Sequence, residues 1–188
     1  MARMHTTTLT AADGDLQVHT DVTGRAARMG HRLTLSVGSW RAEVDWSDDE
    51  PTAVRLTAET ASLAVEHGEG GLTPLSGAER ALARSNALKT LSTQRFPTVS
   101  FETLEVTTIP EGYRLSGDLH IHGHRRAHSV DVQVSDTGTG WTLSARTPVR
   151  QTDFGLTPYS MFMGSLKVAD TVIVTLSATY RDEDRVRV

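Results

Sequence analysis

The residues of this sequence that are best suited to chemistry are four closely spaced histidines, His120, His122, His124 and His128. Neutral imidazole is a good ligand for zinc, copper and nickel. On an extended strand His120 and His122 would point to the same face, because side chains alternate between the two faces. His124 falls in a predicted turn and could join them. One hypothesis is therefore a site for a metal on His120, His122 and His124, in a metal-binding protein or a small enzyme.

The other interpretation is that these histidines face solvent. No Asp-x-His or His-Glu-x-x-His motif supplies a complete set of metal ligands. If Leu119 and Ile121 share an apolar face with Val130 and Val132, then His128 lies on that face, away from the other histidines. This arrangement favours solvent-facing histidines, so we expect no metal and no other cofactor.

Further catalytic motifs are missing. The chain has no cysteine, which excludes disulfides, thiol catalysis and thiolate metal sites. It contains no Gly-x-Ser-x-Gly motif of the kind that carries a serine nucleophile. The glycine-rich stretch 68–74 is not followed by the lysine of a phosphate-binding loop. We therefore expect a binding protein and not an enzyme.

A second unusual segment spans residues 154–166. It carries large apolar or aromatic side chains in a stretch too rich in glycine, proline and serine for a buried strand: Phe154, Tyr159, Met161, Phe162, Met163 and Leu166. Exposed apolar loops usually contact another molecule, and methionine adapts to variable apolar partners. Two interpretations stay open, a lid or portal at the mouth of a cavity and a plug that completes the core.

The elements that position these residues are predicted to be strands. Apolar and polar residues alternate in nine segments, near 16–22, 33–37, 40–46, 54–58, 98–107, 113–122, 127–135, 141–148 and 170–181. Short polar turns separate most of them, which favours antiparallel pairing. We expect an all-β protein with one helix insertion, whose eight or nine strands close into a barrel or pack as a sandwich to hide their edges.

Two local motifs refine this prediction. Residues from 76 to about 93 predict the single helix, because Ser76 and Glu79 form a capping box. Leu88 and Leu91 fall on one apolar stripe of that helix. The short break at Gly38-Ser39, between two alternating segments, predicts a tight hairpin.

The predicted inward faces are apolar and carry no charge. A hydrocarbon chain needs only burial and gains about 0.8 kcal/mol per buried CH₂. The same alternation would also describe a solid core, so a cavity and a packed interior both stay open. If there is a cavity, we expect the ligand to contact Trp40, Trp46, Tyr113 and the 154–166 loop. Arg150 or Lys167 would meet a headgroup.

Bulk properties limit the remaining possibilities. The chain has 188 residues, which predicts one domain over 1–188, with a charged tail at 182–188 that frays. The net charge of −4 argues against nucleic acid as a partner. No apolar run is long enough to span a membrane, and no signal peptide is visible, so we expect a cytoplasmic protein. A homodimer is a further expectation.

Four motifs occur in an order that resembles the polyisoprenoid-binding, YceI-like family. They are Phe96-Pro97-Thr98-Val99-Ser100-Phe101 after the helix, the Tyr113 to Gly123 strand with its Gly117-Asp118-Leu119, the Asp153-Phe154-Gly155 loop, and the closing strand led by Lys167. The resemblance covers residues 54–180. The family's usual Asp-x-x-His-Ser opening is replaced here by Gly30-His31-Arg32.

This resemblance implies a lipocalin-like, extended antiparallel β-barrel. It implies an isoprenoid-like lipid or another amphiphile in the central pore and no catalytic residues. Fold similarity does not by itself fix a ligand.

Overall fold

The computed structural model describes residues 3–181, and the predicted fraying of 182–188 lies outside that range. The strands are β1 (Met4–Thr10), β2 (Gly14–His19), β3 (Val22–Thr23), β4 (His31–Val37), β5 (Trp40–Ser47), β6 (Glu50–Glu59), β7 (Leu63–Gly70), β8 (Thr98–Ile109), β9 (Gly112–Ile121), β10 (His124–Asp136), β11 (Gly140–Arg150), β12 (Ser160–Met161), β13 (Leu166–Val168) and β14 (Thr171–Arg181). One α-helix, α1 (Gly77–Leu91), interrupts them within this range.

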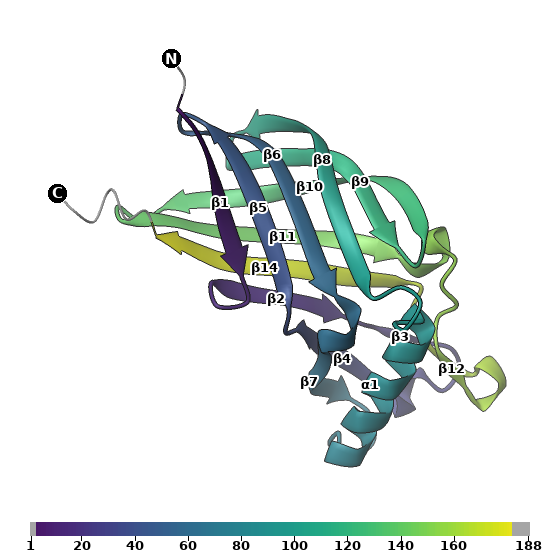
Figure 1. Ribbon diagram of the computed structural model, residues 1–188. Helices are drawn as coiled ribbons and strands as arrows, with labels where there is room; N and C mark the ends of the chain where they lie inside the picture. Colours follow the sequence, from purple (N-terminus) through teal and green to yellow (C-terminus); the bar gives the residue numbers. More distant parts are fainter. Residues whose placement is uncertain (1–2, 182–188) are drawn as a thin grey trace.

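The main sheet is a closed antiparallel barrel (Figure 1). Its strand order is β1-β5-β6-β8-β9-β10-β11-β14-β2-β4-β7. The sheet closes on itself, because three pairs of consecutive strands continue each other: β1 and β2, β4 and β5, and β6 and β7. The first half of each pair bonds to one neighbour, and the second half continues the same pairing further along the barrel. When each of these joined pairs is counted as one long strand, the described residues form a barrel of eight long strands. We call each of these long strands a stave. The predicted lipocalin-like barrel of about eight strands is confirmed.

The predicted hairpin at Gly38-Ser39 is wrong. β4 and β5 do not pair with each other; β4 pairs with β7 and β5 pairs with β6. The chain only bends at Gly38-Ser39, opposite a matching interruption at 60–62. There the Gly38 amide donates to the Ser62 carbonyl at 3.2 Å, and the Ser39 amide donates to the Ser62 hydroxyl at 3.0 Å. The actual reversal follows Ser47, where Asp48 has a φ of 55°.

The first strand was missed by the alternation pattern, which began at Leu16. Residues Met4–Thr10 form β1 and pair with β5. Three successive threonines hide the two-residue period here, although Thr7 and Leu9 are buried and their neighbours are not.

Helix α1 agrees with the prediction. The Ser76 hydroxyl accepts from the Glu79 amide at 3.2 Å, and the Glu79 carboxylate accepts from the Ser76 amide at 2.7 Å, so the capping box is confirmed. Leu88 and Leu91 pack against the barrel core. The helix lies across one end of the barrel, beside β7 (Figure 1). Among residues 3–181, no helix is long and apolar enough to cross a membrane.

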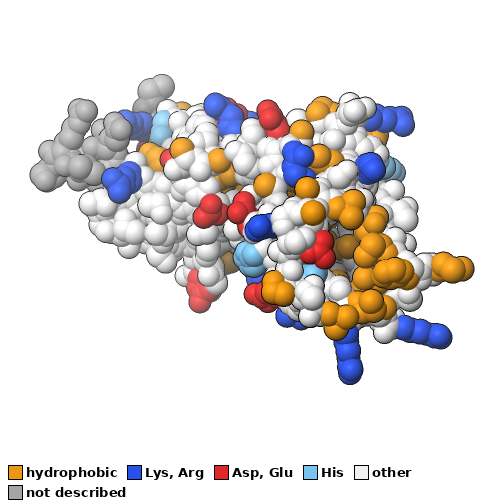
Figure 2. All heavy atoms as spheres, turned by 90° about the horizontal axis from the view of Figure 1, so that it is seen from below, with side chains coloured by type: hydrophobic (Ala, Val, Ile, Leu, Met, Phe, Trp, Pro, Cys, Tyr) orange, Lys and Arg blue, Asp and Glu red, His pale blue; other side chains and the backbone are white. Residues whose placement is uncertain are grey.

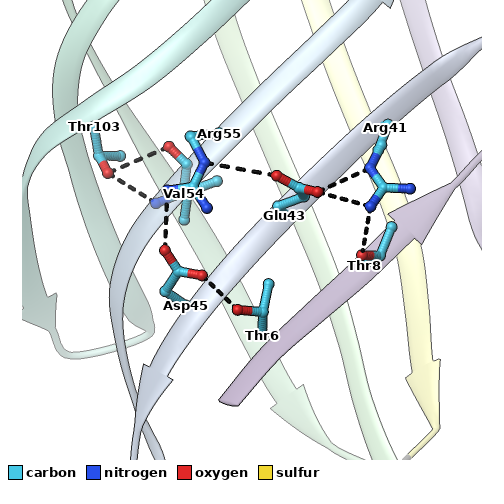
Figure 3. A network of polar contacts seen from close by, with 8 residues as sticks. All are labelled: Thr6, Thr8, Arg41, Glu43, Asp45, Val54, Arg55 and Thr103. Atoms are coloured by element: carbon cyan, nitrogen blue, oxygen red, sulfur yellow. Dashed lines mark hydrogen bonds and ion pairs between the residues drawn. The ribbon is translucent and has the colours of Figure 1, made fainter. Parts of the chain in front are cut away.

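A polar network on the outer wall fastens β1 to its neighbours (Figure 3). Thr6 Oγ1 donates to Asp45 at 2.7 Å, and Arg55 donates to the other Asp45 oxygen at 2.9 Å. The hydrogen bond from Thr6, followed by that from Arg55, holds the pKa of Asp45 below its usual value. Glu43 lies between Arg41, at 2.7 Å, and Arg55, at 3.6 Å. These pairs join β1, β5 and β6 on the side away from the barrel interior.

Candidate functional site

The barrel encloses a cavity of about 680 Å³. Because side chains alternate along each strand, one face of every stave lines this space. On β11 the lining residues are the odd-numbered Trp141, Leu143, Ala145, Thr147 and Val149. Most of the lining is aliphatic or aromatic, and four charged residues also border the cavity, namely Asp49, Glu59, Glu79 and Lys167. A volume of this size falls within the ~300–1,000 Å³ range of small-molecule sites.

The cavity is elongated along the barrel. On β14 its lining runs from Val172 through Val174 and Leu176 to Tyr180. At a rise of ~3.3 Å per residue, this stretch is about 26 Å long. The shape matches a chain-like molecule better than a compact one.

The interior is hollow and not packed solid. In the described residues no side chain is less than 2% exposed. Leu56, Leu143 and Leu176 point into the barrel, yet they are only half-buried. A packed core would cover such side chains completely. Their free surface borders the void, which decides between the two interpretations of the apolar alternation.

A row of stacked aromatic rings lies near the start of β1, and its Trp46, Trp141 and Tyr180 line this end of the cavity. The rings of His5 and Trp46 are 5.9 Å apart, those of Trp46 and Trp141 are 6.0 Å apart, and those of Trp141 and Tyr180 are 5.6 Å apart. The indole Nε1 of Trp46 is buried and has no hydrogen-bond partner among residues 3–181. The atom therefore lies within the wall and not on the surface of the cavity.

Tyr113 also lines this end of the cavity. Burial, together with the nearby carboxylates of Glu50 and Asp49, raises the pKa of its hydroxyl. The phenol therefore stays protonated and can donate a hydrogen bond.

One histidine lies in the wall at mid-height. His128 Nε2 is hydrogen-bonded to Thr147 Oγ1 at 2.8 Å, and its ring stands edge-on to Phe101. Burial lowers the pKa of His128, so the ring is neutral near pH 7. The register pairs β9 Leu115 with Val130, which confirms that His128 shares the apolar face.

The mouth of the cavity lies at the α1 end. Leu82 of α1, Met29, Met161 and Lys167 are exposed and border it, while Tyr159 and the buried Leu166 lie further inside. Seen from this end, apolar side chains gather on one part of the face, with Lys and Arg at its edges (Figure 2). The 154–166 loop divides its residues between two roles, because Phe154 and Leu166 are buried while Met161 to Met163 are exposed.

Six of the predicted ligand-contacting residues line the cavity: Trp46, Tyr113, Tyr159, Met161, Leu166 and Lys167. Five do not: Trp40, Phe154, Phe162, Met163 and Arg150. Trp40 and Phe154 are 4% and 3% exposed and belong to the packed core. Arg150 is on the outside, 3.5 Å from Asp170. Phe162 and Met163 point into solvent beside the mouth.

The alternation pattern also indicates lining residues outside the predicted set. Trp141 and Tyr180 continue the alternation of β11 and β14, so their inward direction follows from Leu143 and Leu176. Met29 gave no such signal, because it lies in an irregular stretch.

The three histidines of the metal hypothesis do not form a cluster. His120 is exposed on β9, but His122 lies beyond the strand, with a φ of 52°, and packs against Phe96 at 4.6 Å. The expectation that His120 and His122 share a strand face is wrong, because the turn begins at His122. His124 stacks on His122 at 6.1 Å. Within the described chain, no group of three His, Cys, Asp or Glu residues could hold a metal ion.

Comparison with known proteins agrees with this architecture. The chain is similar to the crystal structure of Burkholderia cenocepacia BcnA, with a TM-score of 0.69 and 15% identity over 90% of this chain and 98% of that one. It is also similar to a Campylobacter jejuni YceI protein, with a TM-score of 0.61 and 13% identity over 79% and 84% of the two chains.

These similarities show the fold. A search of curated proteins finds none that matches. The model of the YceI-like domain matches residues 6–180, which is nearly the whole described chain. The protein therefore belongs to the YceI-like family.

Proposed function

We propose that this protein binds and carries an isoprenoid-like lipid, or another amphiphile of similar shape, inside the barrel. The observation that carries the proposal is the hollow, elongated and apolar cavity. Burial of hydrocarbon in such a space contributes affinity in proportion to the area removed from water. YceI-like domains commonly bind polyisoprenoids, which supports the same class of ligand.

The proposed contacts follow the lining of the cavity. The chain of the ligand lies along the aliphatic walls between the aromatic end and the mouth, against Trp46, Tyr113, Tyr159, Met161 and Leu166. Tyr113 offers a donor to an oxygen atom at the inner end.

At the mouth, Lys167 is the cation placed to meet an anionic headgroup. Arg150 is engaged with Asp170 outside the barrel, so the headgroup role that the sequence suggested for either residue is proposed for Lys167 alone.

The first experiment is extraction. Native mass spectrometry of gently purified protein should show an added mass that passes into organic solvent. Stripped protein should then bind geranylgeraniol, measured by quenching of tryptophan fluorescence. A protein that carries no extractable mass and does not bind geranylgeraniol or palmitic acid would contradict the proposal.

A matched pair of variants ties this binding to the cavity. Ala145 points inward and Thr142 points outward on the same strand, β11. Ala145→Phe fills the void and should reduce geranylgeraniol affinity at least tenfold. Thr142→Phe adds the same ring to the outer wall and should leave affinity unchanged. Equal affinity for both variants would place the bound lipid outside the barrel.

A further inference from the structure

The mouth of the cavity is surrounded by apolar side chains that nothing in the described chain covers. We call this surface the mouth rim: Met29, Leu82, Met161, Phe162 and Met163. Phe162 is 61% exposed, and Met163 is fully exposed at 106%. The residues come from three separate segments: the turn before β4, helix α1, and the stretch from β12 to β13. Their convergence at one opening is a property of the fold, because no single segment produces it.

The backbone holds part of the rim in an unusual conformation. Phe162 and Met163 both have positive φ, at 50° and 55°. Bulky residues rarely adopt this region, and such strain persists only where the surroundings enforce it.

Here hydrogen bonds enforce it. The Ser165 hydroxyl donates to the Phe162 carbonyl at 2.7 Å, and the Ser165 carbonyl accepts from the Ala26 amide at 2.8 Å. The turn is thus tied to the neighbouring segment, and it presents two large apolar side chains outward.

The rim is continuous with the cavity wall. Met29, Leu82 and Met161 are exposed at the mouth, yet each also lines the cavity. A hydrocarbon chain could pass from a surface in contact with the rim into the barrel and stay against apolar side chains throughout. A protein partner would not require this continuity.

Cations flank the rim. Arg25, Arg28 and Lys167 are exposed, and none forms an ion pair with any residue of 3–181. Asp21 accepts from the Val22 amide and Glu79 from the Ser76 amide, and neither carboxylate forms an ion pair with Arg25, Arg28 or Lys167. The whole chain carries a net charge of −4, so these three cations without an ion pair are a local contrast with the charge of the molecule as a whole.

We propose that the mouth rim docks on the surface of an anionic phospholipid bilayer, with Phe162 and Met163 inserted among the lipids and Arg25, Arg28 and Lys167 at the headgroups. Apolar insertion and electrostatic attraction together give reversible membrane binding. A second copy of the chain is a poorer occupant, since a two-fold contact through the rim would bring two sets of unpaired cations together. Docking does not require a cavity ligand, whereas loading of lipid through the mouth rests on the proposed function.

Vesicle flotation tests docking. The protein should float with vesicles of phosphatidylcholine mixed with phosphatidylglycerol and much less with pure phosphatidylcholine, and salt should weaken binding. Phe162→Ser with Met163→Ser should lower the partition coefficient at least tenfold. Arg25→Gln and Arg28→Gln should each lower it about fivefold. The matched controls, Leu104→Ser and Arg146→Gln, change exposed residues of the outer wall and should bind like the unchanged protein.

Equal binding to both kinds of vesicle, or undiminished binding of the Phe162→Ser, Met163→Ser variant, would overturn the proposal. The proposal would also be overturned if the unchanged protein sedimented as a dimer and bound no vesicles, while the same double variant sedimented as a monomer. Ala145→Phe separates this proposal from the previous one. A blocked cavity should lose geranylgeraniol binding and keep vesicle binding. If the unchanged protein floats but takes up no lipid, docking stands and the carrier function fails.

Discussion

His128 Nε2 and Thr147 Oγ1 are hydrogen-bonded at 2.8 Å across neighbouring strands, inside an otherwise apolar wall. Each side chain gives the other a hydrogen bond that the apolar cavity would not otherwise supply. A histidine in this position cannot accept a proton without placing a charge in the void. The pair therefore connects the pH of the medium to the stability of the barrel.

Acidification should destabilise the protein through His128. Its pKa in the folded state is lowered by burial, while imidazole in the unfolded chain titrates near 6.5. As pH falls from about 7 through the folded pKa, the unfolded chain takes up a proton that the folded state refuses, and stability is lost. Denaturant unfolding at a series of pH values should show a shallower loss for His128→Gln. An unaltered slope in His128→Gln would count against this account.

The hollow interior should tolerate added bulk. Phenylalanine in place of Ala145 occupies empty space, so the free energy of unfolding should fall by less than about 1 kcal/mol or rise. Ala178 lies in the packed core and is 4% exposed. Ala178→Phe should lower the free energy of unfolding by ~1–3 kcal/mol or more, which is the usual effect of overpacking a core. Urea unfolding of both variants measures the difference. A similar cost at the two sites would mean that the interior is not hollow in solution.

The hydroxyl of Tyr113 should matter to ligands that carry an oxygen. Tyr113→Phe removes this donor and keeps the ring, so affinity for geranylgeraniol should fall about fivefold, in line with ~1 kcal/mol for a hydrogen bond. Affinity for squalene, a polyisoprenoid hydrocarbon without an acceptor, should change less.

Trp46 supplies the control. It lines the same end of the cavity, but its Nε1 is buried and has no partner among residues 3–181. Trp46→Phe should leave the ratio of the two affinities unchanged, and fluorescence titrations of both variants give that ratio. An equal loss for both ligands in Tyr113→Phe would assign the effect to ring packing and not to the hydroxyl.

The outer-wall network should contribute modestly to stability. Asp45→Asn removes the charged partner of Arg55, and because both side chains are partly open to solvent the cost at pH 7 should stay below about 1 kcal/mol. The pKa of Asp45 is lowered in the folded state, so its contribution is complete above pH ~4 and is lost as pH falls through the folded pKa. Thermal unfolding at low and high salt should show a smaller difference at high salt. A cost that salt leaves unchanged would argue against an ionic contribution.

Much of the fold could be predicted because local patterns specify it. Period-two alternation identified the inward faces of most strands, and the capping box at Ser76 fixed the start of α1. The alternation also placed His128 on the apolar face. These predictions needed only a residue and its neighbours.

What failed depends on pairing between distant residues. Gly38-Ser39 has the composition of a turn, but its hydrogen bonds to Ser62 make it a bend in one long stave. Trp40 alternates in step with the inward-facing residues of its strand, as a ligand contact would, and yet it lies in the packed core. The mouth residue Met29 comes from an irregular segment, where no periodicity indicates the direction of a side chain. A sequence pattern indicates on which face of a strand a residue lies. The way in which the barrel closes decides which part of that face borders empty space.

The beginning of β1 and the end of β14 lie at the aromatic end of the barrel, far from α1 and the mouth (Figure 1). An engineered tether at either terminus would therefore hold the molecule with its opening turned outward. Immobilised on a sensor chip in this way, the protein could meet vesicles or detergent micelles head-on. A tether inserted between β12 and β13 would press the same opening against the support.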